Sequence, residues 1–210
     1  MWRARLAAFT TAGMQDSTLA ANRRIAELDR TDIRPLLGMA QIYTERVKID
    51  STVPLDTLTL GRVDSLLQRV AALKSNGAGQ PTDTNVWMNV AVMYFKPGTE
   101  LIQARVRPDF AMGWVEKAKR YDVRKQLTTQ ADFFLGLAYT FHLGSAFDLN
   151  AVQQSKSCRT LDSLDQYLKK LRGAMTAGAS VQPATAEQVL GNVAGIEKFV
   201  VDARAAWKCS

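Results

Sequence analysis

Few residues in this chain could do chemistry, and its single histidine, His142, is the first of them. It lies between Phe141 and Leu143 at the end of a predicted helix, where we expect a packed or capping side chain. Since there is no second histidine, serine–histidine, cysteine–histidine and multi-histidine zinc arrangements lack a partner. The 2 cysteines cannot form a four-thiolate zinc site within one chain. We therefore predict no catalytic residue and no metal site.

Loops for phosphate and paired catalytic carboxylates are also missing from the sequence. Neither G-x-G-x-x-G nor G-x-x-x-x-G-K-[ST] occurs, and Gly77 and Gly79 indicate a linker. Asp162 and Asp165 lie on one predicted helix, where we expect them to face solvent beside Lys169 rather than oppose each other across a cleft. We predict no cofactor and a function other than catalysis.

The composition is that of an ordinary globular protein. The 210 residues are 47% hydrophobic and 22% charged, with 6 prolines, and the abundant Ala, Leu, Gln, Lys and Arg favour helices. The net charge is +7, but basic residues are spread along the chain among carboxylates, which is typical of solvated helix faces. We therefore do not expect a nucleic-acid partner. No apolar run reaches the roughly 18 residues that a membrane span needs.

One sequence motif with a fixed spacing recurs in the predicted helices. The segment Trp87-x-x-Val90-Ala91-x-x-Tyr94 places a small residue between apolar and aromatic ones on one helical face. The same spacing recurs in two other segments, Leu36-x-x-Met39-Ala40-x-x-Tyr43 and Asp132-x-x-Leu135-Gly136-x-x-Tyr139. The motif resembles the first-helix signature of tetratricopeptide (TPR) repeats, whose second helix carries A-x3-F-x2-A.

Second-helix motifs alternate with the first. The nearest copy is Ala111-x3-Val115-x2-Ala118, and three weaker copies begin at Ala21, Val63 and Leu164. The tyrosines that end the first motifs are 51 and 45 residues apart, whereas a standard repeat has about 34 residues. We assign the excess to insertions at 51–56, 96–108 and 144–158, with a further break at 76–81.

These patterns predict an all-α, right-handed α-solenoid of antiparallel, TPR-like helix pairs. The predicted pairs are 2–12 with 15–30, 33–47 with 57–74, 84–95 with 109–120, and 128–142 with 160–177. A last helix follows Pro183, with Thr185 and Gln188 at capping-box spacing. We expect about four repeat pairs in residues 1–183 and a capping helix in residues 184–210 that closes the exposed end of the core.

The two cysteines flank the last two predicted helices. A short connection makes these helices antiparallel, which brings Cys158 and Cys209 toward each other once one end bends inward. We predict a disulfide, with two free thiols as the alternative. A disulfide would indicate an oxidising compartment, periplasmic or extracellular. Residues 1–13 do not form a convincing signal peptide, so export would require that the signal is already removed or lies outside this chain.

The resemblance to TPR proteins implies a binding surface lined by the first helices. Carried over by motif position, the expected partner-binding residues are Arg34, Gln41, Met88, Val92, Phe95, Lys96, Phe133, Leu137 and Phe141. Six of these side chains, those of Met88, Val92, Phe95, Phe133, Leu137 and Phe141, are apolar, and we expect something to shield them from water. That cover could be a peptide or small ligand, the chain's own insertions, or another copy of the chain. A basic alternative would bind phosphates through Lys117, Lys119, Arg120, Arg124 and Lys125.

The predicted function is therefore that of a non-enzymatic scaffold for protein interaction or assembly. It would bind a protein or peptide partner through the surface that the first helices line. The alternative is a self-assembling subunit of an extracellular or cell-surface oligomer or filament, in which copies of the chain fill that surface.

Overall fold

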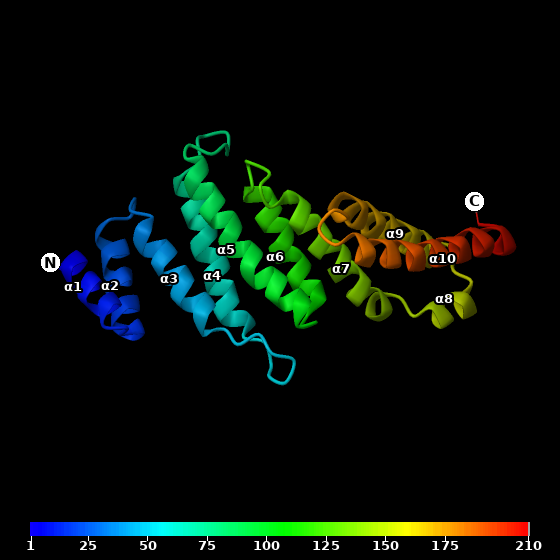
Figure 1. The fold of residues 1–210 in the computed structure, drawn as a ribbon, viewed down its shortest axis with the longest axis horizontal. Helices are drawn as coiled ribbons and strands as arrows, with labels where there is room; N and C mark the ends of the chain where they lie inside the picture. Colours follow the sequence, from blue (N-terminus) through cyan, green and yellow to red (C-terminus); the bar gives the residue numbers. More distant parts are fainter. Residues whose placement is uncertain (210) are drawn as a thin grey trace.

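The computed structural model describes residues 1–209, and all of its regular elements are helices. The helices are α1 (Trp2–Thr11), α2 (Gln15–Leu28), α3 (Arg34–Arg46), α4 (Thr57–Leu73), α5 (Thr84–Gln103), α6 (Pro108–Tyr121), α7 (Thr128–Ala146), α8 (Leu149–Ser155), α9 (Cys158–Gly178) and α10 (Pro183–Trp207). Helices α1 to α7 follow one another along the long axis of the molecule, α9 and α10 lie side by side beyond them, and the two termini are at opposite ends (Figure 1). The predicted all-α class is confirmed.

The helix pairs form because each helix buries one apolar stripe against its neighbours. One core, the N-terminal core, runs from α2 to α7 and includes Leu36, Leu67, Tyr94 and Val115. The other, the C-terminal core, joins α7, α9 and α10. Its α9 and α10 are also tied by an ion pair between Arg172 Nη2 and Glu197 Oε2 at 2.5 Å. Consecutive packing of this kind is what a helical repeat requires. The division at residue 183 and the right-handed sense stay predictions.

The expected end of α5 at residue 95 is wrong. The helix continues to Gln103 with Pro97 in its interior, although an interior proline removes a backbone hydrogen bond and costs about 3 kcal/mol. The extension buries Leu101 and Ile102 completely, and that burial offsets the cost. Gly98 allows the close packing, because a Cβ there would lie 2.9 Å from Val115 Cγ2 on α6.

Two other local predictions differ from the structure. The expected insertion at 144–158 contains the end of α7 and the short helix α8. The predicted capping box at Thr185 is wrong, because α10 begins at Pro183, two residues earlier. The Thr185 hydroxyl instead donates to Gln182 Oε1 at 3.2 Å. Proline at the first helical position has no amide hydrogen, so this start has one fewer backbone donor to satisfy.

Candidate partner-binding groove

A groove of about 400 Å³ runs between α3 and α5, which we call the α3–α5 groove. Its lining residues are Leu37, Gly38, Gln41, Thr44, Glu45, Asn89, Val92, Met93, Lys96 and Pro97. Of the predicted partner-binding residues, Gln41, Val92 and Lys96 are thus brought together here. Positions four residues apart lie on one helical face, which is why the motif register places them on the groove walls.

The α3–α5 groove combines an apolar centre with polar walls of opposite charge. Val92 is 46% exposed, and Leu37 and Met93 continue the apolar surface. On the α3 wall, Gln41 Nε2 donates to Glu45 Oε1 at 2.9 Å, and Lys96 stands on the α5 wall. Neither Glu45 nor Lys96 belongs to an ion pair within residues 1–209. The groove can therefore offer a ligand apolar contacts, an amide, one carboxylate and one ammonium.

Arg34 lines a second hollow of about 430 Å³ between α1, α2 and α3. Gln41 and Glu45 line both hollows, so the two are neighbours along α3. The Arg34 guanidinium is bound to Asp32, with Nη2 2.8 Å from Oδ2. The side-chain hydrogen bond from Arg34 holds the pKa of Asp32 below its usual range, although burial opposes the shift. Arg34 thus borders the site with its charge already paired.

Gly38 on α3 sets how closely α2 approaches the floor between these hollows. A Cβ at Gly38 would lie 3.0 Å from Asn22 Nδ2, and Asn22 is itself buried. Because glycine carries no side chain, α2 and α3 can pack at this distance. The small residue therefore shapes both hollows.

The other predicted apolar residues are largely covered by the chain itself. The Phe95 ring packs edge-on against Phe134 of α7 with centroids 5.9 Å apart. The Arg105 guanidinium lies 4.8 Å from the centre of the Phe141 ring. Leu137 is half-buried between the two cores, and Met88 is also partly buried. Of the three expected kinds of cover, the chain's own segments account for Phe95 and Phe141.

Phe133 does not lie on the binding surface, and this prediction is wrong. Its side chain is 1% exposed and belongs to the C-terminal core. The reason is the length of α9, which reaches Gly178 and passes directly over the start of α7. A Cβ at Gly178 would lie 2.2 Å from the Phe133 backbone nitrogen. Helix α6, which has the equivalent place beside α5, ends at Tyr121 and leaves Met88 partly exposed.

Sequence reasoning missed Asn89, Met93 and Pro97 in the groove and Phe134 beside Phe95. Pro97 was missed because α5 was expected to stop before it. Asn89 and Met93 follow from the same helical face, since Val92 and Lys96 lie three positions after each of them. The apolar stripe on α5 is wider than the motif positions alone, and this width was the signal that could have indicated further groove residues.

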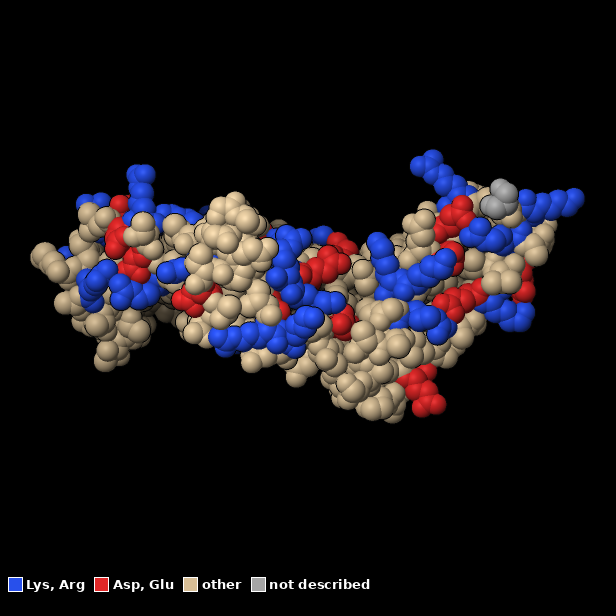
Figure 2. All heavy atoms as spheres, turned by 90° about the horizontal axis from the view of Figure 1, so that it is seen from above, with Lys and Arg blue, Asp and Glu red and all other residues tan. Residues whose placement is uncertain are grey.

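The basic residues proposed for phosphate binding are partly engaged in contacts within the chain. Lys117 Nζ lies 2.6 Å from Asp64 Oδ1, Lys119 is paired with Asp132, and Arg124 donates to Thr84 and Asn85. Figure 2 shows Lys and Arg interspersed with Asp and Glu along the visible face. These positions do not form a continuous free basic surface.

A buried polar network joins α4, α5 and α6. The Tyr94 hydroxyl donates to Asp64 Oδ1 at 2.6 Å, and the same oxygen accepts from Lys117. Burial alone would raise the pKa of Asp64, but the hydrogen bonds from Lys117 and Tyr94 hold it below its usual value. Burial and the hydrogen bond to Asp64 raise the pKa of Tyr94. The network is structural, since its groups satisfy one another.

The other side chains that were considered for chemistry are also engaged in contacts within the chain. His142 Nδ1 lies 2.9 Å from Ser145 Oγ in the last turn of α7. As expected, Lys169 pairs with Asp165 at 2.8 Å, and Asp162 pairs with Arg204. No group of three or more acidic, His or Cys side chains within residues 1–209 is placed to hold a metal ion. No helix in that range combines the length and hydropathy that a bilayer crossing requires.

The predicted disulfide is present between Cys158 and Cys209, with their Cα atoms 5.5 Å apart. Helix α10 is longer than α9, so its end must turn back. Lys208 provides this turn with a left-handed backbone conformation, φ 57°. The bond therefore links the start of α9 to the end of the chain that follows α10.

The fold and groove define an all-α array of helix pairs with a surface groove. No protein-family model matches the chain, and no curated protein sequence is similar to it. Among solved structures, a crystal structure of MamA shares 15% identity at a TM-score of 0.44, covering 95% of this chain and 88% of that one. A second, of MamA protein, shares 15% identity at a TM-score of 0.45, covering 99% and 86%. Similarity at this level assigns no family.

Proposed function

We propose that this protein is a non-enzymatic scaffold that binds a peptide or protein partner in the α3–α5 groove. The observation that carries the proposal is the meeting of Gln41 and Glu45 on α3 with Val92 and Lys96 on α5 in one groove. An extended segment could place apolar side chains on Leu37 and Val92 and its polar groups on Gln41, Glu45 and Lys96. No cofactor is needed for this function.

The test uses peptide selection, because the partner's sequence is open. A random peptide library displayed on phage is panned on the oxidised protein, and enriched peptides are synthesised for titration. The variants Val92→Asp and Lys96→Glu should weaken binding by about tenfold, the effect of about 1.4 kcal/mol. Val201→Asp is the matched control, since Val201 is 66% exposed on α10, far from the groove. Equal loss in the control, or no loss in the groove variants, contradicts the proposal.

Self-assembly is the second candidate, and it rests on the surface apolar residues Val92, Leu58 and Val201. Light scattering over a concentration series separates the two. A mass near the chain's 23.2 kDa at all concentrations supports binding of a foreign partner. A mass that grows with concentration and returns to the monomer value in Val92→Asp supports assembly through the groove.

The disulfide adds a proposal about location. Structural disulfides persist in oxidising compartments, so Cys158–Cys209 supports a periplasmic or extracellular site of action. Thiol labelling of the protein in intact cells of its source, with and without prior reduction, tests this. Labelling without reduction contradicts it.

A further inference from the structure

The three first-helix tyrosines occupy equivalent junctions in the array, and hollows lie beside two of them, Tyr43 and Tyr139. The hollow of about 510 Å³ beside Tyr139 has both acidic and basic lining residues, whereas the charged residues that line the hollow beside Tyr43 are arginines. Each tyrosine lies between the second helix before it and the second helix after it. Tyr43 lies between α2 and α4, Tyr94 between α4 and α6, and Tyr139 between α6 and α9. The side chain that the following second helix packs against each tyrosine also differs between the three junctions.

An aromatic residue from the following second helix packs against Tyr94 and against Tyr139. Trp114 packs against Tyr94 with ring centroids 5.3 Å apart, and Lys117 with Asp64 completes the cover. Tyr167 packs against Tyr139 at 5.3 Å and donates its hydroxyl hydrogen to the Tyr139 carbonyl. Trp114 and Tyr167 hold the same position of the second-helix motif.

In the first junction that motif position is Leu66, and the groove above Tyr43 is open. A hollow of about 550 Å³ there is lined by Met39, Tyr43, Leu58 and Leu66, among others. Leu58 is 69% exposed. A second hollow of about 440 Å³ shares Arg23 and Met39 with the first, so the two are contiguous. We call this surface the α2–α4 groove.

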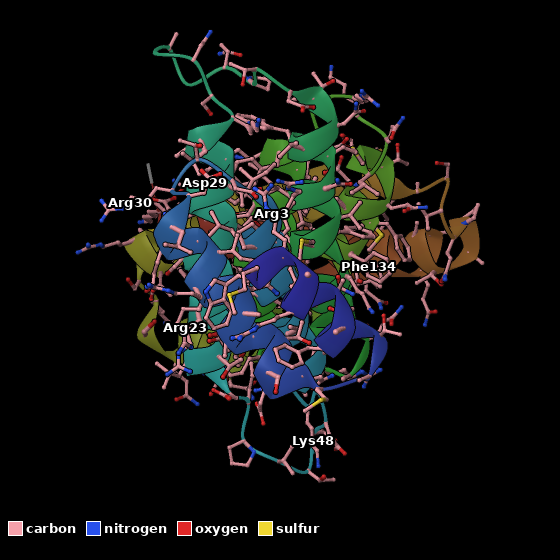
Figure 3. All side chains as sticks on the ribbon, turned by 90° about the vertical axis from the view of Figure 1, so that its left-hand side faces the viewer. Arg3, Arg23, Asp29, Arg30, Lys48 and Phe134 are labelled. Carbon is pink, nitrogen blue, oxygen red and sulfur yellow. A yellow bond between two sulfur atoms is a disulfide. The ribbon has the colours of Figure 1, made fainter. Side chains whose placement is uncertain are left out.

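Four arginines border the α2–α4 groove in two rows. Arg23 is on α2 and Arg30 lies in the turn just after it, and Arg62 and Arg69 are on α4. The two arginines on α4 are seven residues apart, which is two helical turns or about 10 Å. Arg23 and Arg30 project from one flank of the molecule, whereas Phe134 lies on the opposite flank (Figure 3). The surface is therefore separate from the face on which Phe95 and Phe134 pack.

These arginines keep their charges unneutralised among residues 1–209. None of the four lies within 4.0 Å of a carboxylate oxygen there. The nearby acids are paired with other residues: Glu27, which also lines the smaller hollow, pairs with Arg24 at 2.8 Å, and Asp64 pairs with Lys117. Tyr43 contacts two of these arginines. Its hydroxyl accepts a hydrogen bond from Arg23 Nη2 at 3.4 Å, and the centre of its ring lies 6.0 Å from the Arg62 guanidinium carbon.

From this geometry we propose that the α2–α4 groove binds an acidic amphipathic segment of another protein. Apolar side chains of the segment would cover Met39, Leu58 and Leu66, and its carboxylates would meet the arginines on both sides. A helix suits the site, because acidic residues seven apart would match the spacing of Arg62 and Arg69 on α4.

Charge and surface chemistry favour this occupant over the two alternatives. A second copy of this chain carries a net charge of +7, which opposes docking on a basic surface. A nucleic-acid backbone would meet the arginines but would leave charged phosphates over the apolar floor. An acidic segment with an apolar stripe would cover the apolar floor of the groove and would also place carboxylates against the arginines.

The test is a titration with a synthetic helical peptide of about 15 residues, which carries leucines along one stripe and glutamates beside it. Fluorescence anisotropy should show binding that weakens as salt is raised. The same peptide with lysine in place of every glutamate should bind at least about tenfold more weakly.

Protein variants then locate the site. The pairs Arg23→Glu with Arg62→Glu, and Arg30→Glu with Arg69→Glu, should each weaken binding about tenfold or more. The control Arg159→Glu with Lys48→Glu makes the same charge change at exposed positions outside the groove, and should have a much smaller effect. Leu66→Trp should also weaken binding, because it supplies the cover that Trp114 gives Tyr94. Circular dichroism confirms that each variant is folded.

Several results would overturn the proposal. Equal binding of the glutamate and lysine peptides is one, and equal losses in the groove and control pairs is another. If a DNA oligonucleotide binds more tightly than the peptide through the same arginines, the occupant is nucleic acid. If the unliganded protein is a dimer that Arg23→Glu with Arg62→Glu dissociates, the occupant is a second copy. The Val92→Asp variant should bind this peptide normally, which separates the result from that of the α3–α5 groove.

Discussion

Tyr94 and Asp64, 30 positions apart in the sequence, are joined by a hydrogen bond of 2.6 Å from the phenol to the carboxylate. Lys117 donates to the same carboxylate oxygen, so one acidic group on α4 holds α5 and α6 together. Two donors on a partly buried carboxylate stabilise its ionised form. The middle of the array is thus fixed by a polar contact as well as by its apolar core.

Asp64→Asn should therefore lower the free energy of unfolding by about 1–3 kcal/mol at neutral pH. The folded-state pKa of Asp64 lies below its unfolded value, so its stabilisation is present above about pH 4 and is lost as the pH falls through the folded value. The difference between wild type and variant should shrink on acidification. Urea titrations near pH 7 and pH 3 measure it. A difference that does not shrink would show that the charge of Asp64 is not what stabilises the junction.

Helix positions were predictable because their signals are local. An apolar stripe with a period near 3.6 marks each helix, and the linkers contain glycine, proline or capping residues. The end of α5 was not predictable in this way, because Pro97 normally stops a helix. What carries α5 past Pro97 is the burial of Leu101 and Ile102 against neighbouring elements, which no local pattern contains.

The candidate site shows the same division between local and distant causes. The motif register placed Gln41, Val92 and Lys96 in one groove, since each position depends on the turn of its own helix. Phe133 depends on α9, whose length and Gly178 bring a distant backbone over it. The α2–α4 groove likewise depends on Leu66, which leaves Tyr43 without the aromatic neighbour that Trp114 gives Tyr94 and Tyr167 gives Tyr139.

The different environments of Phe133 and Val92 predict effects of very different size for the same substitution to aspartate. Phe133→Asp should lower stability by more than about 3 kcal/mol, because it places a carboxylate in the C-terminal core and removes a buried ring. Val92→Asp should change stability by less than about 1 kcal/mol, because Val92 is 46% exposed. Thermal unfolding followed by circular dichroism compares them. A stable Phe133→Asp protein would show that Phe133 is not a core residue.

The disulfide should stabilise the end of the array specifically. Reduction of Cys158–Cys209, which are 51 positions apart, should lower the free energy of unfolding by about 2–4 kcal/mol. Amide hydrogen exchange should quicken first near the end of α10 and the start of α9, where the bond holds the chain. The Cys158→Ser with Cys209→Ser variant is the control and should not respond to reductant. Unchanged exchange at these ends on reduction would contradict the prediction.

Two glycines of α9 should respond oppositely to alanine. At Gly178 an added Cβ would lie 2.2 Å from Phe133 N and 2.4 Å from its Cα, so α7 and α9 must separate. We expect Gly178→Ala to cost about 1–3 kcal/mol or more. At Gly173 no atom lies within 4 Å of the added Cβ, and alanine should stabilise the helix by about 0.5–1 kcal/mol. Urea unfolding of both variants provides the measurement. Stabilisation by both would mean that the α7–α9 contact is looser than the packing of Gly178 on Phe133 requires.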